Sequence, residues 1–241
     1  MRGLSPALGI VVTAAVVVFA LSCTLQRHEA DEAAPAPVRA AYEASGNALF
    51  DAVLERAAVV GSCEVLVVGD SLVEGLHGNY SGKDIFAAGV RGAGTADWLA
   101  YAPLLLRVIK PKTVILALGV NDSPRLRPDK LPDFFRRYEE VCRLLSGGGA
   151  KLAVSTVLPV RRGKGKKGRA ANRIDPAVLR RMNAGIVRIA DAGGYEVIHS
   201  FAAVADGAGM LPQPLTFDGI HLTKAGYERW EKVLFAGRTS S

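Results

Sequence analysis

The clearest structural signal in the chain is the stretch Val65-Leu66-Val67-Val68-Gly69-Asp70-Ser71-Leu72. Its first four residues are apolar without alternation, which is typical of a parallel strand that is covered on both faces. The glycine that follows permits a sharp bend, so we expect the strand to turn directly into a helix with the Ser71 hydroxyl at its start. The stretch therefore predicts a buried strand followed by a tight strand-to-helix turn.

Four further runs rich in β-branched residues follow, with amphipathic stretches between them. They cover residues 85–87, 113–118, 152–157 and 196–198. A repeated order of strand and helix with short connections is typical of parallel α/β sheets. The sequence predicts an α/β fold with a flavodoxin-like, doubly wound parallel sheet of five strands and helices on both faces.

Residues with strong preferences for helix ends flank the stretches between the strands. The expected helices are one over about residues 39–58, one over residues 96–109 capped by Thr95, one from Pro132 to residue 145, one begun by Asp175 and Pro176, and one capped by Thr223 that runs through residue 235. The glycines at 147–149 and 193–194 are expected to end two of them.

The composition is typical of a packed globular protein, with 49% hydrophobic and 22% charged residues in a chain of 241. A net charge of +7 would favour nucleic-acid binding if the basic residues covered a broad surface. The excess lies in residues 161–173, because the rest of the chain has 23 basic and 23 acidic residues. We therefore predict no nucleic-acid partner.

Three parts of the chain differ in character. They are an N-terminal signal or anchor segment over residues 1–25, a linker over residues 26–38 and a folded domain over residues 39–241. The linker has mixed charge and two prolines, which suits a spacer between a membrane and a domain.

The N-terminal segment contains an apolar run over residues 7–21 that ends at Ser22 and Cys23. A small residue followed by cysteine at this place is what bacterial lipoprotein processing uses, so Cys23 is a candidate lipidation site, although Ala20 stands where such signals usually have leucine. The alternative is an uncleaved membrane anchor. Both interpretations predict a domain tethered outside the cytoplasmic membrane in a bacterial cell envelope.

Two cysteines remain in the predicted domain, Cys63 at the start of the first strand and Cys142 late in the helix after the third strand. Both should lie toward the same edge of the sheet, and a disulfide and two separately buried thiols are both compatible with that placement. The two residues are too far apart in the sequence for a zinc knuckle. We predict neither a metal nor a cofactor.

Functional groups of parallel sheets gather at the carboxyl ends of the strands, and three such ends are unusual here. The Ser71 turn would expose a nucleophilic hydroxyl, but Gly-Asp-Ser is also a common turn. The glycine-rich residues 89–95 could bring backbone N–H groups to a substrate oxygen or to a phosphate. Asn121 could donate to an oxyanion, but Asn121 and Asp122 also form an ordinary capping pair. Each pattern alone leaves both interpretations open.

Asp218 and His221 are three residues apart near the C-terminus. This spacing lets the carboxylate reach one imidazole nitrogen and leaves the other free to take a proton from a serine. The order of serine, aspartate and histidine along the chain is one of the orders found for this triad. A surface histidine beside a helix cap is the alternative.

Together these patterns resemble the SGNH family of GDSL esterases and lipases over about residues 63–235. The resemblance implies a serine hydrolase of carboxylic esters that works through an acyl-enzyme and needs no cofactor. It implies the nucleophile Ser71, the acid Asp218, the base His221, and an oxyanion hole made by the N–H groups of Ser71 and Gly92 and the amide of Asn121. One departure is Ala87, since family members often have asparagine there.

The basic residues from Arg161 to Arg169 follow the fourth strand and should emerge on the side of the site. They are either a solvated loop or an attachment point for an anionic substrate or envelope surface. An enzyme tethered in the envelope would meet small acyl groups, such as acetyl groups on carbohydrate or lipid.

Three other function classes account for parts of the sequence. An O-acyltransferase would use the same acyl-enzyme and pass the acyl group to a sugar hydroxyl. A non-catalytic envelope-binding module would not need the five residues of the site. A nucleotide-binding protein would need the Gly-Lys-Ser/Thr of a phosphate-binding loop, which residues 89–94 lack.

Overall fold

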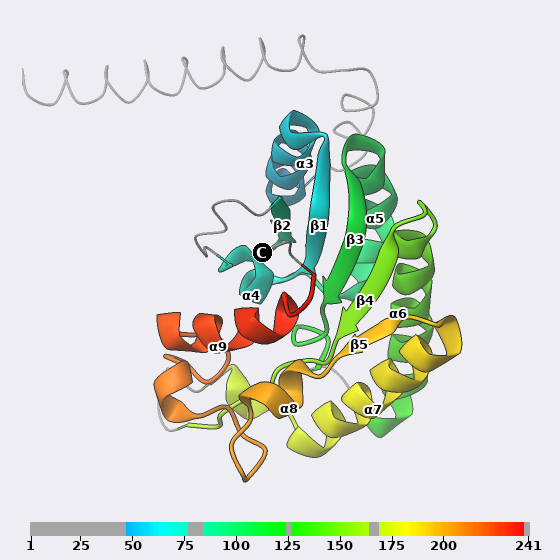
Figure 1. The fold of residues 1–241 in the computed structure, drawn as a ribbon. Helices are drawn as coiled ribbons and strands as arrows, with labels where there is room; N and C mark the ends of the chain where they lie inside the picture. The colour runs from blue at the N-terminus through cyan, green and yellow to red at the C-terminus, as the bar shows by residue number, and fades with distance from the viewer. Residues whose placement is uncertain (1–46, 77–83, 124–126, 164–168, 239–241) are drawn as a thin grey trace, which may run out of the picture.

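The computed structural model describes residues 47–76, 84–123, 127–163 and 169–238, which form a layered α/β unit around a central sheet (Figure 1). The predicted signal segment with Cys23, the predicted linker and the basic residues 164–168 lie outside the described residues. No helix within the described ranges is both long enough and apolar enough to cross a membrane.

Strands and helices alternate along the described chain. The strands are β1 (Ser62–Gly69), β2 (Ile85–Gly89), β3 (Lys110–Ala117), β4 (Lys151–Ser155) and β5 (Glu196–Ile198). The α-helices are α3 (Ala48–Val60), α4 (Ser71–Glu74), α5 (Thr95–Val108), α6 (Leu131–Ser146), α7 (Pro176–Gly193), α8 (Ser200–Val204) and α9 (Lys224–Leu234). Short 3-10 helices are η2 (Pro128–Lys130), η4 (Ala171–Arg173) and η5 (Gln213–Leu215).

The sheet has the order β2-β1-β3-β4-β5 with every pair parallel, which confirms the predicted flavodoxin-like, doubly wound architecture. Its register places Gly69 opposite Gly89 on one side and opposite Ala117 on the other. The loops that carry the candidate residues after β1, β2 and β3 therefore leave the sheet side by side at one edge.

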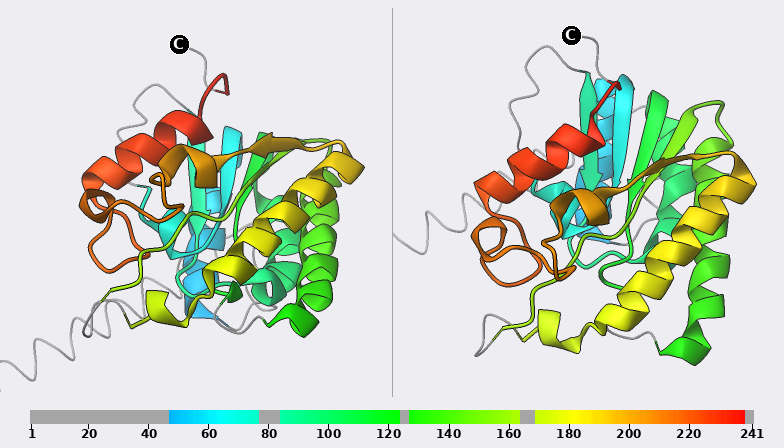
Figure 2. Two further views of the ribbon diagram at one scale, coloured as in Figure 1. Left: turned by 90° about the horizontal axis from the view of Figure 1, so that it is seen from below. Right: turned by 60° about the horizontal axis from the view of Figure 1, so that its bottom comes forward.

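Helices cover both faces of this sheet. The helices α3, α5, α6 and α7 pack against one another over one face, and α8 and α9 lie together on the opposite face (Figures 1 and 2). The central strands are buried from both sides, with Val67 and Ile115 at 0% exposure. This two-sided burial explains why their sequences are apolar without alternation.

Most expected elements are present, with shifted ends. β3 begins three residues before the expected start, and β1 begins at Ser62, one residue before Cys63. Ser62 pairs with Lys110 at the beginning of the shared ladder. β4 ends at Ser155, two residues before the expected end. The first expected helix is described from Ala48, where the Asn47 side chain accepts the Leu49 N–H, and it ends at Val60.

Two expected helix caps are confirmed and one is wrong. The side chains of Asp175 and Thr223 accept the N–H groups of Ala177 and Gly226. Thr95, by contrast, is the first residue of α5 and does not cap it, because the cap is Gly94. The hydroxyl of Thr95 donates to the Asp122 carboxylate instead, a partner distant in sequence.

Cys63 and Cys142 are both buried free thiols. Their exposed fractions are 3% and 0%. The structure therefore has the two separate thiols and not the disulfide. Burial raises the pKa of the Cys63 thiol to about 11 and that of Cys142 to about 12, so both side chains are packed as small apolar groups.

Candidate active site

The turn after β1 presents Ser71 at the carboxyl edge of the sheet. Asp70 caps α4 by accepting the Leu72 N–H at 2.9 Å, and Ser71 is the first helical residue. Gly69 is required at this bend, since a Cβ there would lie 2.4 Å from the carbonyl oxygen of Ala117. The indole of Trp98 donates to the Gly69 carbonyl at 3.0 Å, so a buried ring also holds the turn.

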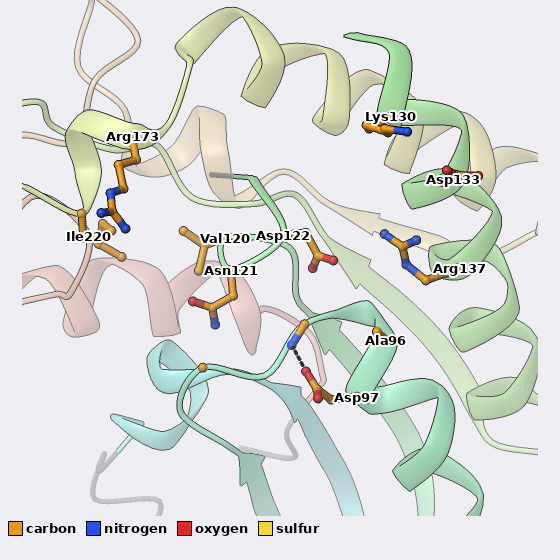
Figure 3. Close-up of a pocket in the computed structure, with 13 residues that line it drawn as sticks. Ala96, Asp97, Val120, Asn121, Asp122, Lys130, Asp133, Arg137, Arg173 and Ile220 are labelled. Carbon is orange, nitrogen blue, oxygen red and sulfur yellow. Dashed lines mark hydrogen bonds between the residues drawn. The ribbon is translucent and has the colours of Figure 1, made fainter. Parts of the chain in front are cut away.

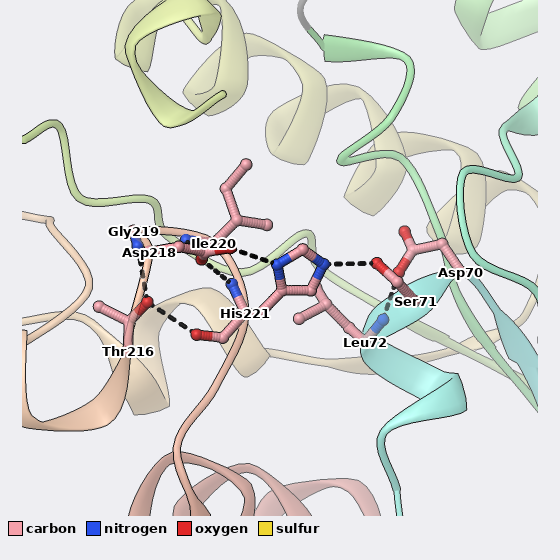
Figure 4. A network of polar contacts seen from close by, with 8 residues as sticks. All are labelled: Asp70, Ser71, Leu72, Thr216, Asp218, Gly219, Ile220 and His221. Atoms are coloured by element: carbon pink, nitrogen blue, oxygen red, sulfur yellow. Dashed lines mark hydrogen bonds and ion pairs between the residues drawn. The ribbon is translucent and has the colours of Figure 1, made fainter. Parts of the chain in front are cut away.

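The loop that carries Asp218 and His221 is held by the Thr216 side chain and by the backbone of Arg161 (Figure 4). The Thr216 hydroxyl accepts the Gly219 N–H and donates to the His221 carbonyl, at 2.9 and 2.7 Å. The Gly219 carbonyl accepts the Arg161 N–H, and φ at Gly219 is +93°, which favours glycine. These bonds fix the loop against the segment after β4.

Ser71, His221 and Asp218 form one chain of hydrogen bonds (Figure 4). Ser71 Oγ lies 2.9 Å from His221 Nε2, and His221 Nδ1 lies 2.6 Å from Asp218 Oδ2. The other oxygen, Asp218 Oδ1, accepts the N–H groups of Ile220 and His221. The arrangement can transfer a proton from the serine to the imidazole and hold the resulting positive charge beside a carboxylate.

Two carboxyl groups at the site, Asp218 and Asp70, have pKa values shifted in opposite directions. Burial disfavours the charged form of Asp218, but hydrogen bonds from His221 and from two backbone N–H groups outweigh it and lower its pKa. Burial dominates at Asp70, which is 1% exposed, and raises its pKa to about 7 against the opposing Leu72 N–H bond. Asp218 is therefore an anion at neutral pH beside His221.

Gly92 and Asn121 supply candidate oxyanion donors. Gly92 is exposed with φ at +80°, and neither its N–H nor that of Ser71 donates to another described residue. Asn121 Nδ2 donates to the Ala93 carbonyl at 3.0 Å, which orients the amide and leaves its second N–H available. Three donors are thus present on the loops after β1, β2 and β3.

The glycine-rich loop after β2 is not arranged to hold a phosphate. The Gly94 N–H donates to Asp97 at 2.8 Å, and the Thr95 N–H donates to Asp122 at 3.1 Å. Carboxylates from the protein thus occupy the N-terminus of α5, where a phosphate would bind. Asp122 is therefore not a local cap but links the loop after β3 to the start of α5.

A cavity of about 1010 Å³ adjoins the oxyanion residues (Figure 3). Its lining comes from the loops after β2 and β3, from the start of α5, from η2, α6 and the turn at η4, and from the loop that carries His221. The lining residues are Gly92, Gly94, Ala96, Asp97, Val120, Asn121, Asp122, Lys130, Asp133, Arg137, Ala170, Arg173 and Ile220. Since Gly92, Asn121 and Ile220 line it, the cavity connects the oxyanion donors with the His221 loop.

All five candidate residues from the sequence are in the described part of the chain. The structure brings Ser71, Asp218 and His221 into direct contact and places Gly92 and Asn121 in the adjoining cavity. Arg161, from the predicted basic attachment point, adjoins the His221 loop through its backbone, but its guanidinium donates to Asp206 and to the Leu211 carbonyl. Among the described residues, no group of three or more His, Cys, Asp or Glu could hold a metal ion.

Sequence reasoning missed several neighbours of the site. Phe217 is 62% exposed and stacks on the His221 ring, with 5.8 Å between ring centroids and 13° between ring planes. Lys130 and Arg137 line the cavity from η2 and α6. Thr216 could have been noticed only as a polar residue two positions before Asp218, and Phe217 carries no sequence signal of this role.

Comparisons with known proteins agree with the geometry. The family model described as GDSL-like Lipase/Acylhydrolase family matches residues 67–229. No curated protein sequence matches the chain.

Three solved structures illustrate the similarity of fold. A GDSL-like lipase from Bacteroides thetaiotaomicron has 18% identity and a TM-score of 0.64, covering 78% of this chain and 96% of its own. The lipase/acylhydrolase from Enterococcus faecalis has 20% identity and a TM-score of 0.57, covering 73% and 96%. An acetylxylan esterase from Geobacillus stearothermophilus has 15% identity and a TM-score of 0.56, covering 76% and 97%.

Proposed function

The chain belongs to the GDSL-like lipase/acylhydrolase family, and we propose that it hydrolyses carboxylic esters of small acyl groups through an acyl-enzyme on Ser71. The observation that carries the proposal is the chain of hydrogen bonds from Ser71 through His221 to Asp218. A binding protein gains nothing from these hydrogen bonds, whereas a serine nucleophile needs a base within hydrogen-bond reach.

The first step is attack on the ester carbonyl carbon. His221 Nε2 removes the Ser71 proton as Oγ forms the new bond, and Asp218 stabilises the imidazolium through Nδ1. The negative charge that develops on the carbonyl oxygen is stabilised by the N–H groups of Ser71 and Gly92 and by the Asn121 amide. One such donor typically contributes about 3–4 kcal/mol to the transition state.

The second step completes the hydrolysis. The imidazolium of His221 protonates the leaving alcohol as the carbon–oxygen bond of the ester breaks. Water then attacks the acyl-enzyme, His221 takes one of its protons, and the same donors stabilise the second oxyanion. Proton return to Ser71 Oγ releases the carboxylic acid and restores the enzyme.

Acetyl or other small acyl groups on envelope carbohydrate or lipid are the proposed substrates. Two observations support this class: one structure of similar fold is an acetylxylan esterase, and the N-terminal apolar run suits an envelope location. The proposed contact of residues 161–169 with an anionic surface rests on the residues after Arg161, because Arg161 itself is paired with Asp206.

The test is hydrolysis of p-nitrophenyl acetate and a longer-chain p-nitrophenyl ester by the protein and by its Ser71→Ala variant. Removing the nucleophile should lower kcat by several powers of ten, because only the oxyanion donors and substrate binding would remain. A Ser123→Ala variant is a matched control, since Ser123 is a buried serine after β3 whose hydroxyl donates to the Val120 carbonyl. The chain-length preference would narrow the acyl group.

Equal rates with and without the Ser71 hydroxyl would contradict hydrolysis of these esters through an acyl-enzyme. Acyl transfer would then be examined with sugar acceptors, by measuring whether acylated product appears only when the acceptor is present.

The proposed envelope location has its own experiment. If Cys23 is lipidated, labelled palmitate should be incorporated into the protein in cells, and Cys23→Ala should abolish the label. Membrane association without label would favour the uncleaved anchor.

A further inference from the structure

The cavity beside the oxyanion donors is lined by three cationic and three acidic side chains (Figure 3). The acids have more hydrogen-bond partners within the protein than the cations do. Each acid has a protein partner. Asp97 accepts the Gly94 N–H, Asp122 accepts the Thr95 N–H and hydroxyl, and Asp133 pairs with Arg136 at 3.5 Å. The acids therefore already have donors within the protein.

The three cationic side chains have fewer hydrogen-bond partners within the protein than the acids have. Arg137 is half-buried and donates to the Thr95 hydroxyl at 3.1 Å beside Asp122. The side chains of Lys130 and Arg173 are exposed and form no hydrogen bond or ion pair with another described residue. Two of the three cations thus have free donors in a cavity that reaches the oxyanion residues.

The position of Arg173 is fixed by the segment that carries it. Asn172 forms two hydrogen bonds with the backbone of Gly163, at 3.1 and 2.8 Å. Ala171 is fully buried against the His221 loop, where a Cβ on Gly219 would lie 3.0 Å from the Ala171 Cβ. Arg173 extends from this anchored turn toward Ile220 and Val120 (Figure 3).

We propose that this cavity is a subsite for a carboxylate carried by the ester substrate, with Arg173 as its ligand and Lys130 as a more distant cation on the opposite side of the cavity (Figure 3). The inference rests on the proposed esterase function and names the substrate class: an ester whose acid or alcohol part carries a carboxylate. A guanidinium fork matches the two oxygens of a carboxylate. A monoanion also meets less repulsion from the three aspartates than a dianionic phosphate would.

The volume agrees with this assignment. A cavity of about 1010 Å³ is far larger than an acetyl group needs and lies at the upper end of the range for small-molecule sites. It can therefore hold the part of the substrate that carries the charge, beyond the carbonyl group at the oxyanion donors.

Two matched pairs of esters test the proposal by turnover. One pair is mono-p-nitrophenyl glutarate and p-nitrophenyl valerate, which differ by a carboxylate on the acyl side. The other is 4-acetoxybenzoate and its methyl ester, which differ by a carboxylate on the alcohol side. The readout is the ratio of kcat/KM for the charged ester to that for the neutral ester, because intrinsic reactivity cancels when ratios are compared between variants.

Arg173→Gln should lower this ratio on the order of tenfold in at least one pair, as expected for the loss of a charge-assisted hydrogen bond, and Lys130→Gln should lower it less. Arg181→Gln is the matched control, since Arg181 is an exposed arginine of α7 outside this cavity lining, and it should leave the ratio within about twofold. Ratios that Arg173→Gln leaves unchanged in both pairs would overturn the proposal.

A binding measurement separates this inference from the esterase proposal. The Ser71→Ala variant is titrated calorimetrically with both members of each pair, and the charged ester of the preferred pair should bind about tenfold more tightly. The added Arg173→Gln change should remove the difference. Equal binding of charged and neutral esters refutes the subsite, whereas selective binding without any turnover by the wild-type protein refutes the esterase function alone.

Discussion

Asp218 positions His221 with both of its oxygens. One oxygen accepts a hydrogen bond from the imidazole, with 2.6 Å between Nδ1 and Oδ2, and the other accepts the backbone N–H groups of Ile220 and His221. The backbone bonds hold the carboxylate in place. The imidazole bond favours the tautomer with its proton on Nδ1, which leaves Nε2 free to accept the Ser71 proton. The orientation of His221, the proposed base, and the stabilisation of its charged form thus depend on one side chain.

Asp218→Asn should lower kcat for p-nitrophenyl acetate by on the order of 10³–10⁴. An amide can donate to Nδ1 and so favours the wrong tautomer, and it carries no charge to stabilise the imidazolium. The thermal unfolding temperature serves as the control for folding. A kcat within tenfold of the wild-type value would show that Asp218 does not position the base.

The ionisation of Asp70 should make the stability of the folded protein depend on pH. Its pKa is about 7 in the folded protein against an ordinary value of 3.8, so the folded state binds more protons between these pH values than the unfolded chain does. Its contribution therefore lowers stability as pH rises from about 4 to about 7. Asp70→Asn should unfold at a higher temperature than wild type at pH 8, and this gain should shrink toward pH 4.

Asp175→Asn is the matched control for this experiment, because Asp175 is also a helix N-cap but is exposed. Thermal unfolding of the three proteins at several pH values gives the comparison. A gain for Asp70→Asn that does not change with pH would mean that the charge of Asp70 is not its cause.

At the level of elements, the short helix α4 packs directly on the end of β2. A Cβ on Gly89 would lie 1.9 Å from the backbone nitrogen of Glu74, so only glycine fits where the two elements cross. Gly89 is also the register partner of Gly69, at the start of the Ser71 turn. The same close approach therefore supports the position of the proposed nucleophile.

Gly89→Ala should lower the free energy of unfolding by about 1–3 kcal/mol, the usual range for overpacking, because backbone atoms cannot move aside as a side chain can. Gly148→Ala is the control, since a Cβ there meets nothing within 4 Å. Urea unfolding curves measure both variants. Equal stabilities would show that α4 shifts without cost.

On the scale of the whole molecule, Cys63 and Cys142 report on global unfolding. Both thiols are buried, and burial raises their pKa values to about 11 and about 12, so the reactive thiolate is scarce and inaccessible in the folded state. Iodoacetamide should modify neither in the native protein, and it should modify both after unfolding without a reducing agent.

Peptide mass mapping identifies the modified residues. Protection of both cysteines that persists in denaturant and is removed only by reduction would reveal a disulfide, in contradiction to the structure. Modification of either in the native protein would show that its region opens locally.

Local sequence signals were sufficient for the architecture and for singling out the candidate site residues one by one. Apolar runs located the five strands, and capping residues such as Asp175 and Thr223 located helix starts, because both signals act between neighbours in the sequence. The spacing of Asp218 and His221 predicted their contact for the same reason. Ser71 lies 150 residues from His221 in the sequence. Only the resemblance to a family predicted that the two side chains belong to one site.

Tertiary structure alone decided which polar groups meet across the fold. Thr95 was expected to cap its own helix, but its hydroxyl donates to Asp122, 27 residues away. The same holds for burial and for charge: the raised pKa of Asp70 and the free guanidinium of Arg173 depend on what surrounds them in space. Hydrogen bonds and desolvation act over a few ångströms irrespective of sequence separation. The sequence by itself therefore determined which segments form strands and helices, and the packing determined which polar groups surround the site.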